Sequence, residues 1–292
     1  MLNTVAIYSK EGNSKTAEGV SRLIRELSKR KIRIYHYQKP QADTAANEQV
    51  QPGRFSDLGS LHELPDMVLS VGGDGTFLET MLKVRRFGIP IAGVNTGRMG
   101  FLANISDDEI GHSIDLLCNG DYEIIERSLL EIKSPPDLFN RESSTALNEI
   151  TVQKADPSMI IINVHVNGIY LNTYWADGLI ISTATGSTAY NLSVGGPILS
   201  PEDESIIISP ISPHNLTIRP IVISGESELK MTVEGRTTEY LATCDFRSRR
   251  LAFNKEINII RSPEKLKTVM LRERDFYSTL RNKLMWGADK RN

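Results

Sequence analysis

Apolar residues in the first half of the chain fall into short unbroken runs and into helically spaced sets. Apolar residues three and four apart predict helices over residues 17–27 and 76–87. Short apolar strands that alternate with helices are typical of a parallel sheet covered on both faces. We therefore expect an α/β domain with a parallel sheet over residues 1–127. Its strands are expected at residues 4–8, 31–37, 66–71 and 89–94.

The second half of the chain has almost no helical spacing, and β-rich runs follow one another. Asn163 and His165 alternate with apolar residues, which predicts a strand with one buried face. Asn167-Gly168 follows, and its tolerance of positive φ predicts a two-residue hairpin. We expect an antiparallel all-β domain, a β-sandwich, over residues 128–262. Its other strands are expected at residues 129–133, 150–153, 169–174, 177–182, 215–223, 228–233, 240–246 and 256–260.

Two segments break these patterns. Residues 38–65 are polar and contain Pro, Gly, Asn and Gln without periodicity, which indicates a loop or a poorly ordered segment. Residues 263–292 return to helical character, with Phe276, Leu280 and Leu284 four apart and basic residues between them. Such a helix can dock on the rest of the protein or meet a membrane or a partner. We expect its apolar stripe to dock.

Composition narrows the function classes. The chain has 292 residues, 40% of them hydrophobic and 24% charged, which is typical of a folded protein. Its 34 Lys and Arg against 36 Asp and Glu give a net charge of −2, which argues against nucleic-acid and anionic-lipid partners. Cys118 and Cys244 are too few for a disulfide framework. The N-terminus lacks the features of a signal peptide. The uncharged residues 179–201 are long enough to span a membrane, but their Gly, Ser, Thr and Pro argue against a lipid-facing helix. The sequence therefore predicts a cytoplasmic protein.

The peptide Gly72-Gly73-Asp74-Gly75 directly follows an expected strand and precedes an expected helix. Residues without Cβ permit a sharp turn and a close approach of the backbone to phosphate. The amides of the following helix would then face an anion. Asp74 has two interpretations that spacing alone weighs equally, an N-cap of the helix or a catalytic acid/base.

A second glycine turn, residues 93–102, follows the next expected strand and contains Arg98. Neighbouring parallel strands that both end in glycine loops form a crevice at their carboxyl ends, where open α/β sheets bind ligands. Arg98 is placed to reach a phosphate, although a lone surface arginine more often has no specific role.

Two polar segments of the second half are candidates for a binding site. Asn148 and Glu149 are adjacent at a strand start, so both face one ligand only if the backbone turns there. Residues 177–201, uncharged from residue 179 onward, combine small hydroxyl residues, glycines and Tyr190, which offers a flat face for a base or ribose. We expect a polar, neutral ligand site in this segment.

Taken together, these peptides resemble the NAD kinase family, which is related to diacylglycerol kinases, sphingosine kinases and phosphofructokinases. The wider group shares the GGDG turn. The narrower resemblance rests on GVNTGRMGFLA at residues 93–103, ALNEI at residues 146–150 and DGLIISTATGSTAYNLSVGGPILSP at residues 177–201. The family's plan, an α/β domain followed by a β-sandwich and a last segment that returns to the first domain, agrees with the periodicities.

The resemblance implies ATP-dependent phosphorylation of the 2′-hydroxyl of the adenosine ribose of NAD, giving NADP, with a divalent cation, Mg²⁺ by expectation. It implies that Asp74 accepts the hydroxyl proton and that Gly72, Gly73 and Gly75 lie close to phosphate. Phosphoryl transfer needs positioning and charge neutralisation, and one aligned carboxylate suffices as the base.

For the acceptor, the resemblance implies that Asn148 and Glu149 hold ribose or metal-bridged groups. It assigns no metal ligand of the protein. The residues implied to bind NAD are Asp177, Thr188, Ala189, Tyr190, Asn191, Leu192 and Ser193.

This chain departs from the family pattern at three places. Ala184 and Trp175 replace a common proline and a common basic residue. Asp245-Phe246-Arg247 stands where many members have Asp-Gly-Gln, so that site is not carried over.

Two other functions remain open at this stage. A lipid kinase would use the same turn and show an apolar or basic membrane-facing surface, and a sensor would bind NAD without turnover. The family commonly forms homodimers or homotetramers through the β domain, so we expect one of these. His214 is placed either to face a ligand or neighbouring subunit or to be buried with its hydrogen bonds satisfied.

Overall fold

The chain forms two compact units in a computed structural model. The structure describes residues 2–10, 14–37, 53–97, 100–136, 138–139, 144–236, 238–253 and 255–285. Unit 1 comprises Met1–Ile125 with Lys267–Asn292, and unit 2 comprises Glu126–Leu266. The C-terminal segment therefore belongs to the same unit as the N-terminus. No helix among the described residues is long and apolar enough to cross a membrane.

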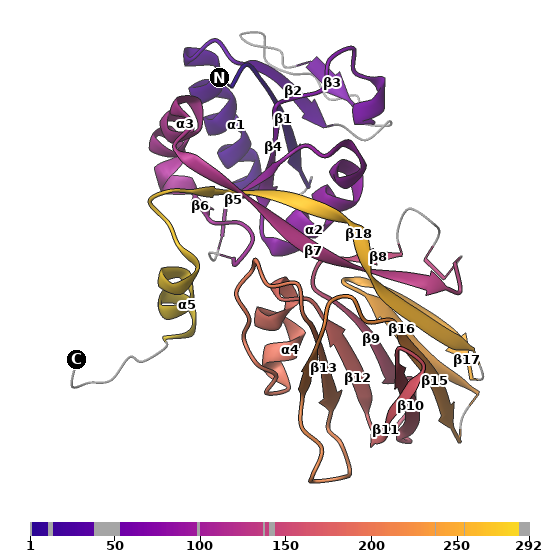
Figure 1. Cartoon of the computed structure of the whole chain (residues 1–292). Helices are drawn as coiled ribbons and strands as arrows, with labels where there is room; N and C mark the ends of the chain where they lie inside the picture. Colours follow the sequence, from indigo (N-terminus) through magenta and orange to yellow (C-terminus); the bar gives the residue numbers. More distant parts are fainter. Residues whose placement is uncertain are drawn as a thin grey trace, which may run out of the picture. The chain divides into compact units, whose positions relative to one another are not determined.

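Unit 1 is built on a parallel sheet with the strand order β5-β4-β1-β2-β3 (Figure 1). Its central strands are buried on both faces, as expected for a sheet with helices on each side. The strands are β1 (Thr4–Ser9), β2 (Arg33–Tyr37), β3 (Gly53–Phe55), β4 (Met67–Gly72) and β5 (Ile91–Asn95), and short β6 (Ile105–Ser106) pairs with β5.

The helices of unit 1 cover this sheet. Helices α1 (Ser14–Lys29) and α3 (Ile110–Asn119) lie side by side and share a core with alternate residues of β1, β4 and β5. Helix α2 (Asp74–Val84) contacts β4 and β5, but its buried residues lie outside that core, which places α2 on the opposite face. Helix α5 (Phe276–Leu284) closes the described chain.

Unit 2 is a sandwich of two sheets around one apolar core. One sheet has the order β11-β10-β15-β18 and the other has the order β14-β13-β12-β9-β16-β17. Neighbouring strands in both orders pair antiparallel. The strands are β7 (Tyr122–Ser134), β8 (Thr145–Ala146), β9 (Glu149–Lys154), β10 (Ile160–Val166), β11 (Ile169–Ala176), β12 (Gly178–Ser182), β13 (Ile206–Ile211), β14 (Ile221–Ile223), β15 (Leu229–Gly235), β16 (Glu239–Cys244), β17 (Arg247–Ala252) and β18 (Glu256–Leu271).

The expected fold class, an α/β domain with a parallel sheet plus an antiparallel β domain, is confirmed. The hairpin at Asn167-Gly168 is also confirmed, with φ of 52° and 78° at the two residues between β10 and β11.

Three expectations about secondary structure are wrong. The predicted loop contains β3, because Phe55 is buried beside Tyr37 at the sheet edge, while residues 38–52 lie outside the described residues. Only the end of residues 215–223 is a strand, because Asn215 accepts a hydrogen bond from the Thr217 amide and forms a turn instead. Residues 263–271 are not helical, because β18 continues through them and Thr268 pairs with Ile91 of β5.

Candidate functional site

The glycine turns of unit 1 lie at the carboxyl ends of two adjacent parallel strands. Strand β4 ends at Gly72, which is in register with Asn95 at the end of β5. Helix α2 begins directly at Asp74 with Gly73 as its N-cap, and no side chain caps it. The first amides of this 11-residue helix therefore face outward from the sheet edge where α/β folds bind ligands.

The carboxylate of Asp74 joins the two glycine turns. Its Oδ2 accepts a hydrogen bond from the Phe101 amide at 3.0 Å, and its Oδ1 accepts from the amides of Leu102 at 3.2 Å and Ala103 at 3.1 Å. An ionised carboxylate has about four acceptor positions, so the donors among the described residues leave one on Oδ2. The N-cap interpretation of Asp74 is therefore wrong, because its side chain reaches across to the second turn.

Glycine is required on both sides of this arrangement. Gly72 has a φ of +148°, and a Cβ there would lie 2.4 Å from Oγ1 of Thr76. A Cβ at Gly100 would lie 1.7 Å from Oδ1 of Asp74. At Gly73 and Gly75 a Cβ would meet no atom within 4 Å, so their backbones border open space beside the start of α2. The turn is thus tightly packed at Gly72 and Gly100 and borders open space at Gly73 and Gly75.

A second carboxylate organises the Asn148-Glu149 turn in unit 2. The buried Asp245 side chain accepts hydrogen bonds from the amides of Leu147 at 3.0 Å, Asn148 at 2.8 Å and Glu149 at 3.2 Å. Asp245 has a φ of +51° at the turn between β16 and β17. The backbone turn that the adjacent Asn148 and Glu149 need is therefore built on Asp245.

The carboxyl group of Glu149 lies in an environment that keeps it neutral. Burial and the nearby charge of Asp245 raise its pKa to about 8, against a smaller opposing effect of the Tyr190 amide. Its Oε2 is buried and has no hydrogen-bond partner among the described residues. Burial likewise raises the pKa of Asp245. Glu149 thus offers a buried carboxyl oxygen with free hydrogen-bonding capacity.

The segment after β12 is attached to the same turn. The hydroxyl of Thr183 donates to the Leu147 carbonyl at 2.6 Å, and the Thr183 amide donates to the Asn148 carbonyl at 2.9 Å. A Cβ at Gly186 would lie 2.1 Å from the Asn148 carbonyl oxygen, so only glycine permits this approach. Residues 185–193 then form a 3₁₀ turn and the short helix α4 (Tyr190–Ser193), which lie beside Asn148 and Glu149.

Comparison with known proteins identifies the family. The model of the ATP-NAD kinase N-terminal domain matches residues 5–122, and that of the ATP-NAD kinase C-terminal domain matches residues 147–271. The chain belongs to the ATP-NAD kinase family. It catalyses the ATP-dependent phosphorylation of NAD to NADP, which removes the lipid-kinase and non-catalytic alternatives.

Named relatives and solved structures agree with this family assignment. The chain is 41% identical to an NAD kinase of Flavobacterium psychrophilum, covering 99% of each chain, and 46% identical to that of Flavobacterium johnsoniae, covering 82% of each. The structure of an NAD kinase from Archaeoglobus fulgidus in complex with ATP matches with a TM-score of 0.74 and 26% identity, over 97% of this chain and 98% of that one. Yeast NADH kinase complexed with NADH shares the fold, with a TM-score of 0.80 and 23% identity, over 99% of this chain and 89% of that one.

The residues that the family resemblance implies for NAD binding differ in their exposure and contacts. Thr188, Ala189, Tyr190, Leu192 and Ser193 are exposed or half-buried around the turn of Asn148 and Glu149.

Asn191 differs from them, because its side chain is fully buried. Its Nδ2 donates to the carbonyls of Ser187 and Pro197, and its Oδ1 accepts from Ser209. These bonds give Asn191 an internal role that the family pattern alone does not reveal.

Within one chain, Asp177 lies at the other end of β12 from Glu149. It precedes β12 and forms an ion pair with Lys154 at 2.7 Å, whereas Glu149 pairs with Ser182 at the other end of β12. The strand between these ends spans about 13 Å. Arg98 lies outside the described residues, and His214 is exposed, with its amide bonded to the Trp175 carbonyl, so the buried interpretation of His214 is wrong.

Sequence reasoning does not find three residues that organise this site. The replacement of a glycine by Phe246 argues against a role for Asp245, but Asp245 itself adopts the positive φ, so the turn needs no glycine at the next position. Arg247 donates to the Thr145 carbonyl at 2.7 Å and thereby ties this hairpin to β8. Buried Arg127 donates to the hydroxyl of Thr185 at 3.2 Å, and no sequence motif indicated this contact.

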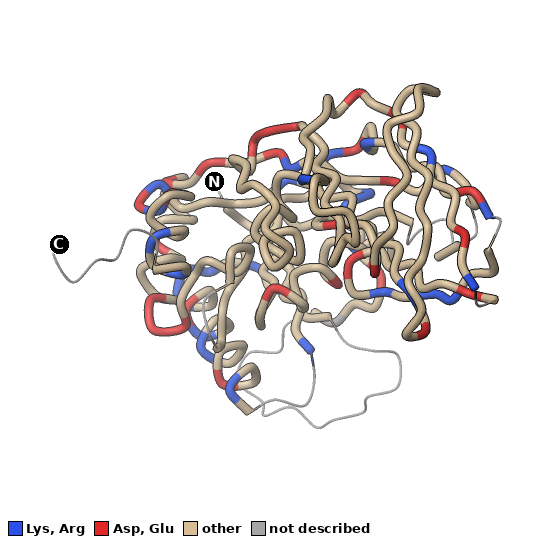
Figure 2. The backbone as a smooth tube through the Cα atoms, turned by 90° about the horizontal axis from the view of Figure 1, so that it is seen from below, with Lys and Arg blue, Asp and Glu red and all other residues tan. Residues whose placement is uncertain are grey.

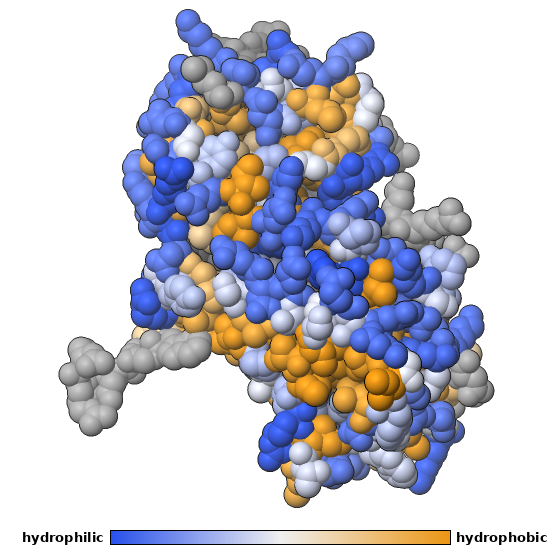
Figure 3. Space-filling model, in the orientation of Figure 1, coloured by the Kyte–Doolittle hydropathy of each residue, from blue (hydrophilic) through white to orange (hydrophobic). Residues whose placement is uncertain are grey.

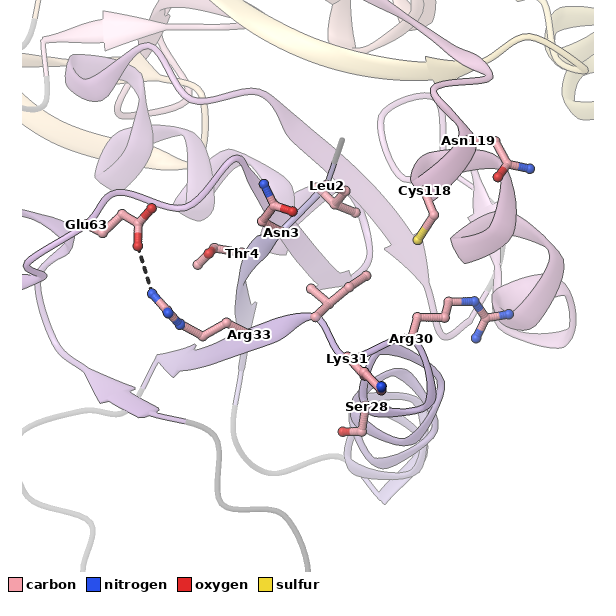
Figure 4. Close-up of a pocket in the computed structure, with 11 residues that line it drawn as sticks. Leu2, Asn3, Thr4, Ser28, Arg30, Lys31, Arg33, Glu63, Cys118 and Asn119 are labelled. Atoms are coloured by element: carbon pink, nitrogen blue, oxygen red, sulfur yellow. Dashed lines mark hydrogen bonds and ion pairs between the residues drawn. The ribbon is translucent and has the colours of Figure 1, made fainter.

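A cavity of about 880 Å³ in unit 1 is lined by residues from the start of β1 and the ends of α1 and α3, including Arg30, Arg33 and Cys118 (Figure 4). It lies at the amino ends of the strands, at the edge opposite the glycine turns. Arg30 is paired with Glu26 and Asp115, and Arg33 is paired with Glu63. The cavity is therefore not part of the kinase site.

Lys and Arg residues are interspersed with Asp and Glu residues along the chain (Figure 2). Among the described residues, no three His, Cys, Asp or Glu side chains cluster as metal ligands. A Mg²⁺ ion that arrives coordinated by phosphates needs few protein ligands, so this finding is compatible with MgATP as the substrate.

Proposed function

We propose that Asp74 is the general base of the NAD kinase reaction. Its spare Oδ2 acceptor position takes the proton of the 2′-hydroxyl on the adenosine ribose of NAD. The hydroxyl oxygen then forms a bond to the γ-phosphorus of ATP, the bond from that phosphorus to the bridging oxygen breaks, and ADP leaves. The observation that carries this role is the carboxylate held in one orientation by three backbone amides, with one acceptor position remaining.

The phosphates of ATP are assigned to the start of α2. Gly73 and Gly75 leave open space there, and the helix terminus presents amide donors and the positive end of its dipole. Mg²⁺ enters as part of the MgATP substrate and neutralises phosphate charge. Glycine at both positions allows the backbone to approach the phosphate oxygens closely.

NAD is assigned to the turn of Asn148 and Glu149 and to the exposed residues around Tyr190. A neutral Glu149 carboxyl can donate a hydrogen bond as well as accept one, which suits a ribose with several hydroxyl groups. Tyr190 is 36% exposed and offers a ring face for stacking. These polar, uncharged groups bind a sugar without adding repulsion to the phosphates.

A homo-oligomer formed through unit 2 is part of the proposal. Ile169 and Trp175 of β11 are exposed by 74% and 47%, and Leu216 before β14 is exposed by 85%. Figure 3 shows apolar side chains gathered on one face of unit 2. Such a surface marks a protein interface, and a second copy is the partner we propose. Sedimentation of the wild-type chain and of Ile169→Asp tests it, since the variant should shift to monomer.

The test of the acceptor site is a Tyr190→Ala variant assayed with ATP, Mg²⁺ and NAD, with NADP detected by an NADP-specific dehydrogenase. We expect the KM for NAD to rise about 5- to 100-fold, because stacking on one base contributes about 1–3 kcal/mol. Tyr277→Ala, which removes an exposed tyrosine from α5, should leave the KM for NAD unchanged. An unchanged KM in Tyr190→Ala would remove this residue from the site. NAD carrying a 2′-deoxyribose on its adenosine should not be phosphorylated.

A further inference from the structure

Lys283, in the last turn of α5, lies beside the Asp74 turn although about 200 residues separate them in sequence. Its Nζ is 4.4 Å from the centroid of the Phe101 ring, and the amide of Phe101 donates to Oδ2 of Asp74 at 3.0 Å. The ammonium group thus lies over the residue that holds the proposed base. All of these residues belong to unit 1.

The helix that carries Lys283 is fixed in place. Glu273 pairs with His112 of α3 at 2.8 Å, and Arg274 pairs with Glu109 just before α3. Asp275 caps α5 by accepting from the Ser278 amide at 2.8 Å, and Leu280 is buried. The backbone of Lys283 is therefore placed by a capped helix that is docked through Leu280.

The charge of Lys283 is incompletely compensated. Burial lowers its pKa, whereas the negative charge of Asp74 acts to raise it. Among the described residues, no ion pair joins its Nζ to a carboxylate, and the negative charge of Asp74 acts on it from beyond ion-pair distance. The aromatic face of Phe101 supplies only part of the stabilisation that a half-buried cation needs. A bound anion would complete the compensation of this charge.

We propose that Lys283 binds a phosphate group of the ATP that is bound at the start of α2, and that it neutralises negative charge beside Asp74 during transfer. This rests on the proposed phosphate site at Gly73 and Gly75. A lysine is suited to this role as a compact cation with three rotatable donors. It would also keep ATP and the Asp74 carboxylate, which are both negative, from repelling each other.

A purely structural alternative assigns Lys283 only its alkyl packing on Phe101. Lys283→Met retains an unbranched chain and removes the charge, and Lys283→Arg retains the charge. Arg281→Met is the matched control, because Arg281 is an exposed cation on the same helix. Each variant is first checked by thermal unfolding, so that a loss of folded protein is separated from a loss of ATP binding.

The experiment measures the dissociation constant of MgATP by calorimetry without NAD, followed by the KM values for ATP and NAD. We expect Lys283→Met to weaken ATP binding at least 10-fold and to raise the KM for ATP, while the KM for NAD stays within twofold. Lys283→Arg should recover most of the affinity, and Arg281→Met should match the wild type. Wild-type ATP affinity in Lys283→Met, or an equal rise of both KM values, would overturn the proposal. The phosphate site at the glycine turn is tested separately with Gly73→Val. If the wild-type chain binds ATP and Gly73→Val does not weaken that binding, the glycine turn is not the phosphate site.

Discussion

Two aspartates in different units each accept hydrogen bonds from three successive backbone amides, but their surroundings differ. Asp74 accepts the amides of three successive residues, Phe101 to Ala103, and Asp245 accepts those of Leu147 to Glu149. The side chain of Asp245 is fully buried, with Arg247 at 3.7 Å, whereas Asp74 lies at the open start of α2.

The same three-amide clamp is thus a scaffold in unit 2 and, in the mechanism that we propose, part of the reactive centre in unit 1. Such a clamp fixes a loop relative to a carboxylate, and the carboxylate relative to the loop. In unit 2 the loop is the useful part, because it carries Asn148 and Glu149. In unit 1 the carboxylate is the useful part, because it keeps an acceptor position facing the ligand side. Access, rather than the hydrogen-bond pattern, separates the two roles.

The largest effect is expected at Asp74. Asp74→Asn should lower kcat about 10²- to 10⁴-fold, because the amide cannot accept the hydroxyl proton. The structure adds a second effect, since the side-chain NH₂ then faces a backbone N–H in place of a carboxylate oxygen. We therefore also expect a loss of about 1–3 kcal/mol in the free energy of unfolding. Urea titration measures the loss of stability, and turnover is assayed at a temperature at which the variant is folded. Near-normal turnover would contradict the role of Asp74 as the base.

The next effect is expected at Gly100. Gly100→Ala places a Cβ where Oδ1 of Asp74 now lies, so the carboxylate or the turn must move. A misplacement of about 1 Å can cost about 100-fold in rate. We expect kcat to fall by this order while the KM for NAD changes little, as measured by steady-state kinetics. Gly111→Ala is the control, because its Cβ would meet only Glu26 at 3.9 Å. Equal kinetics of the two variants would show that the clamp on Asp74 has no catalytic value.

A smaller effect, on stability rather than turnover, is expected at Asp245. Asp245→Asn leaves one of three buried amides facing an NH₂ group, which should lower the free energy of unfolding by about 1–3 kcal/mol. Urea denaturation measures this loss, with the exposed Asp156→Asn as the control, expected within about 0.5 kcal/mol of wild type. The kcat of the folded variant should remain much closer to wild type than that of Asp74→Asn. A collapse of kcat without loss of stability would reverse the roles of the two aspartates.

Sequence reasoning found Asp74 and missed Asp245 for a physical reason. Asp74 lies in a glycine-rich peptide between a strand and a helix, so local pattern alone marks it as chemical. Asp245 acts on residues almost one hundred positions earlier in the chain, and only the pairing of β16 with β9 brings them together. The same limit explains Lys283, whose helix was predicted but whose contact with Phe101 depends on tertiary packing. The hairpin at Asn167-Gly168 was predictable because its signal is local, whereas β3 and β13 were not expected from the sequence.

A further prediction concerns the electrostatics of the Asp245 turn, since Asp245 helps to keep Glu149 protonated. The pKa of Glu149 is raised from 4.5 to about 8, so the folded state holds a proton that the unfolded state releases above pH 4.5. Stability from this group is therefore full below pH 4.5 and is lost as the pH rises towards 8. The difference in unfolding free energy between wild type and Glu149→Gln should fall steadily in urea titrations at pH 5, 6, 7 and 8. The exposed Glu202→Gln is the control for losing one carboxyl group. A constant difference would mean that Glu149 is ionised in the folded protein, and the ribose would then meet an acceptor-only carboxylate rather than a hydrogen-bond donor.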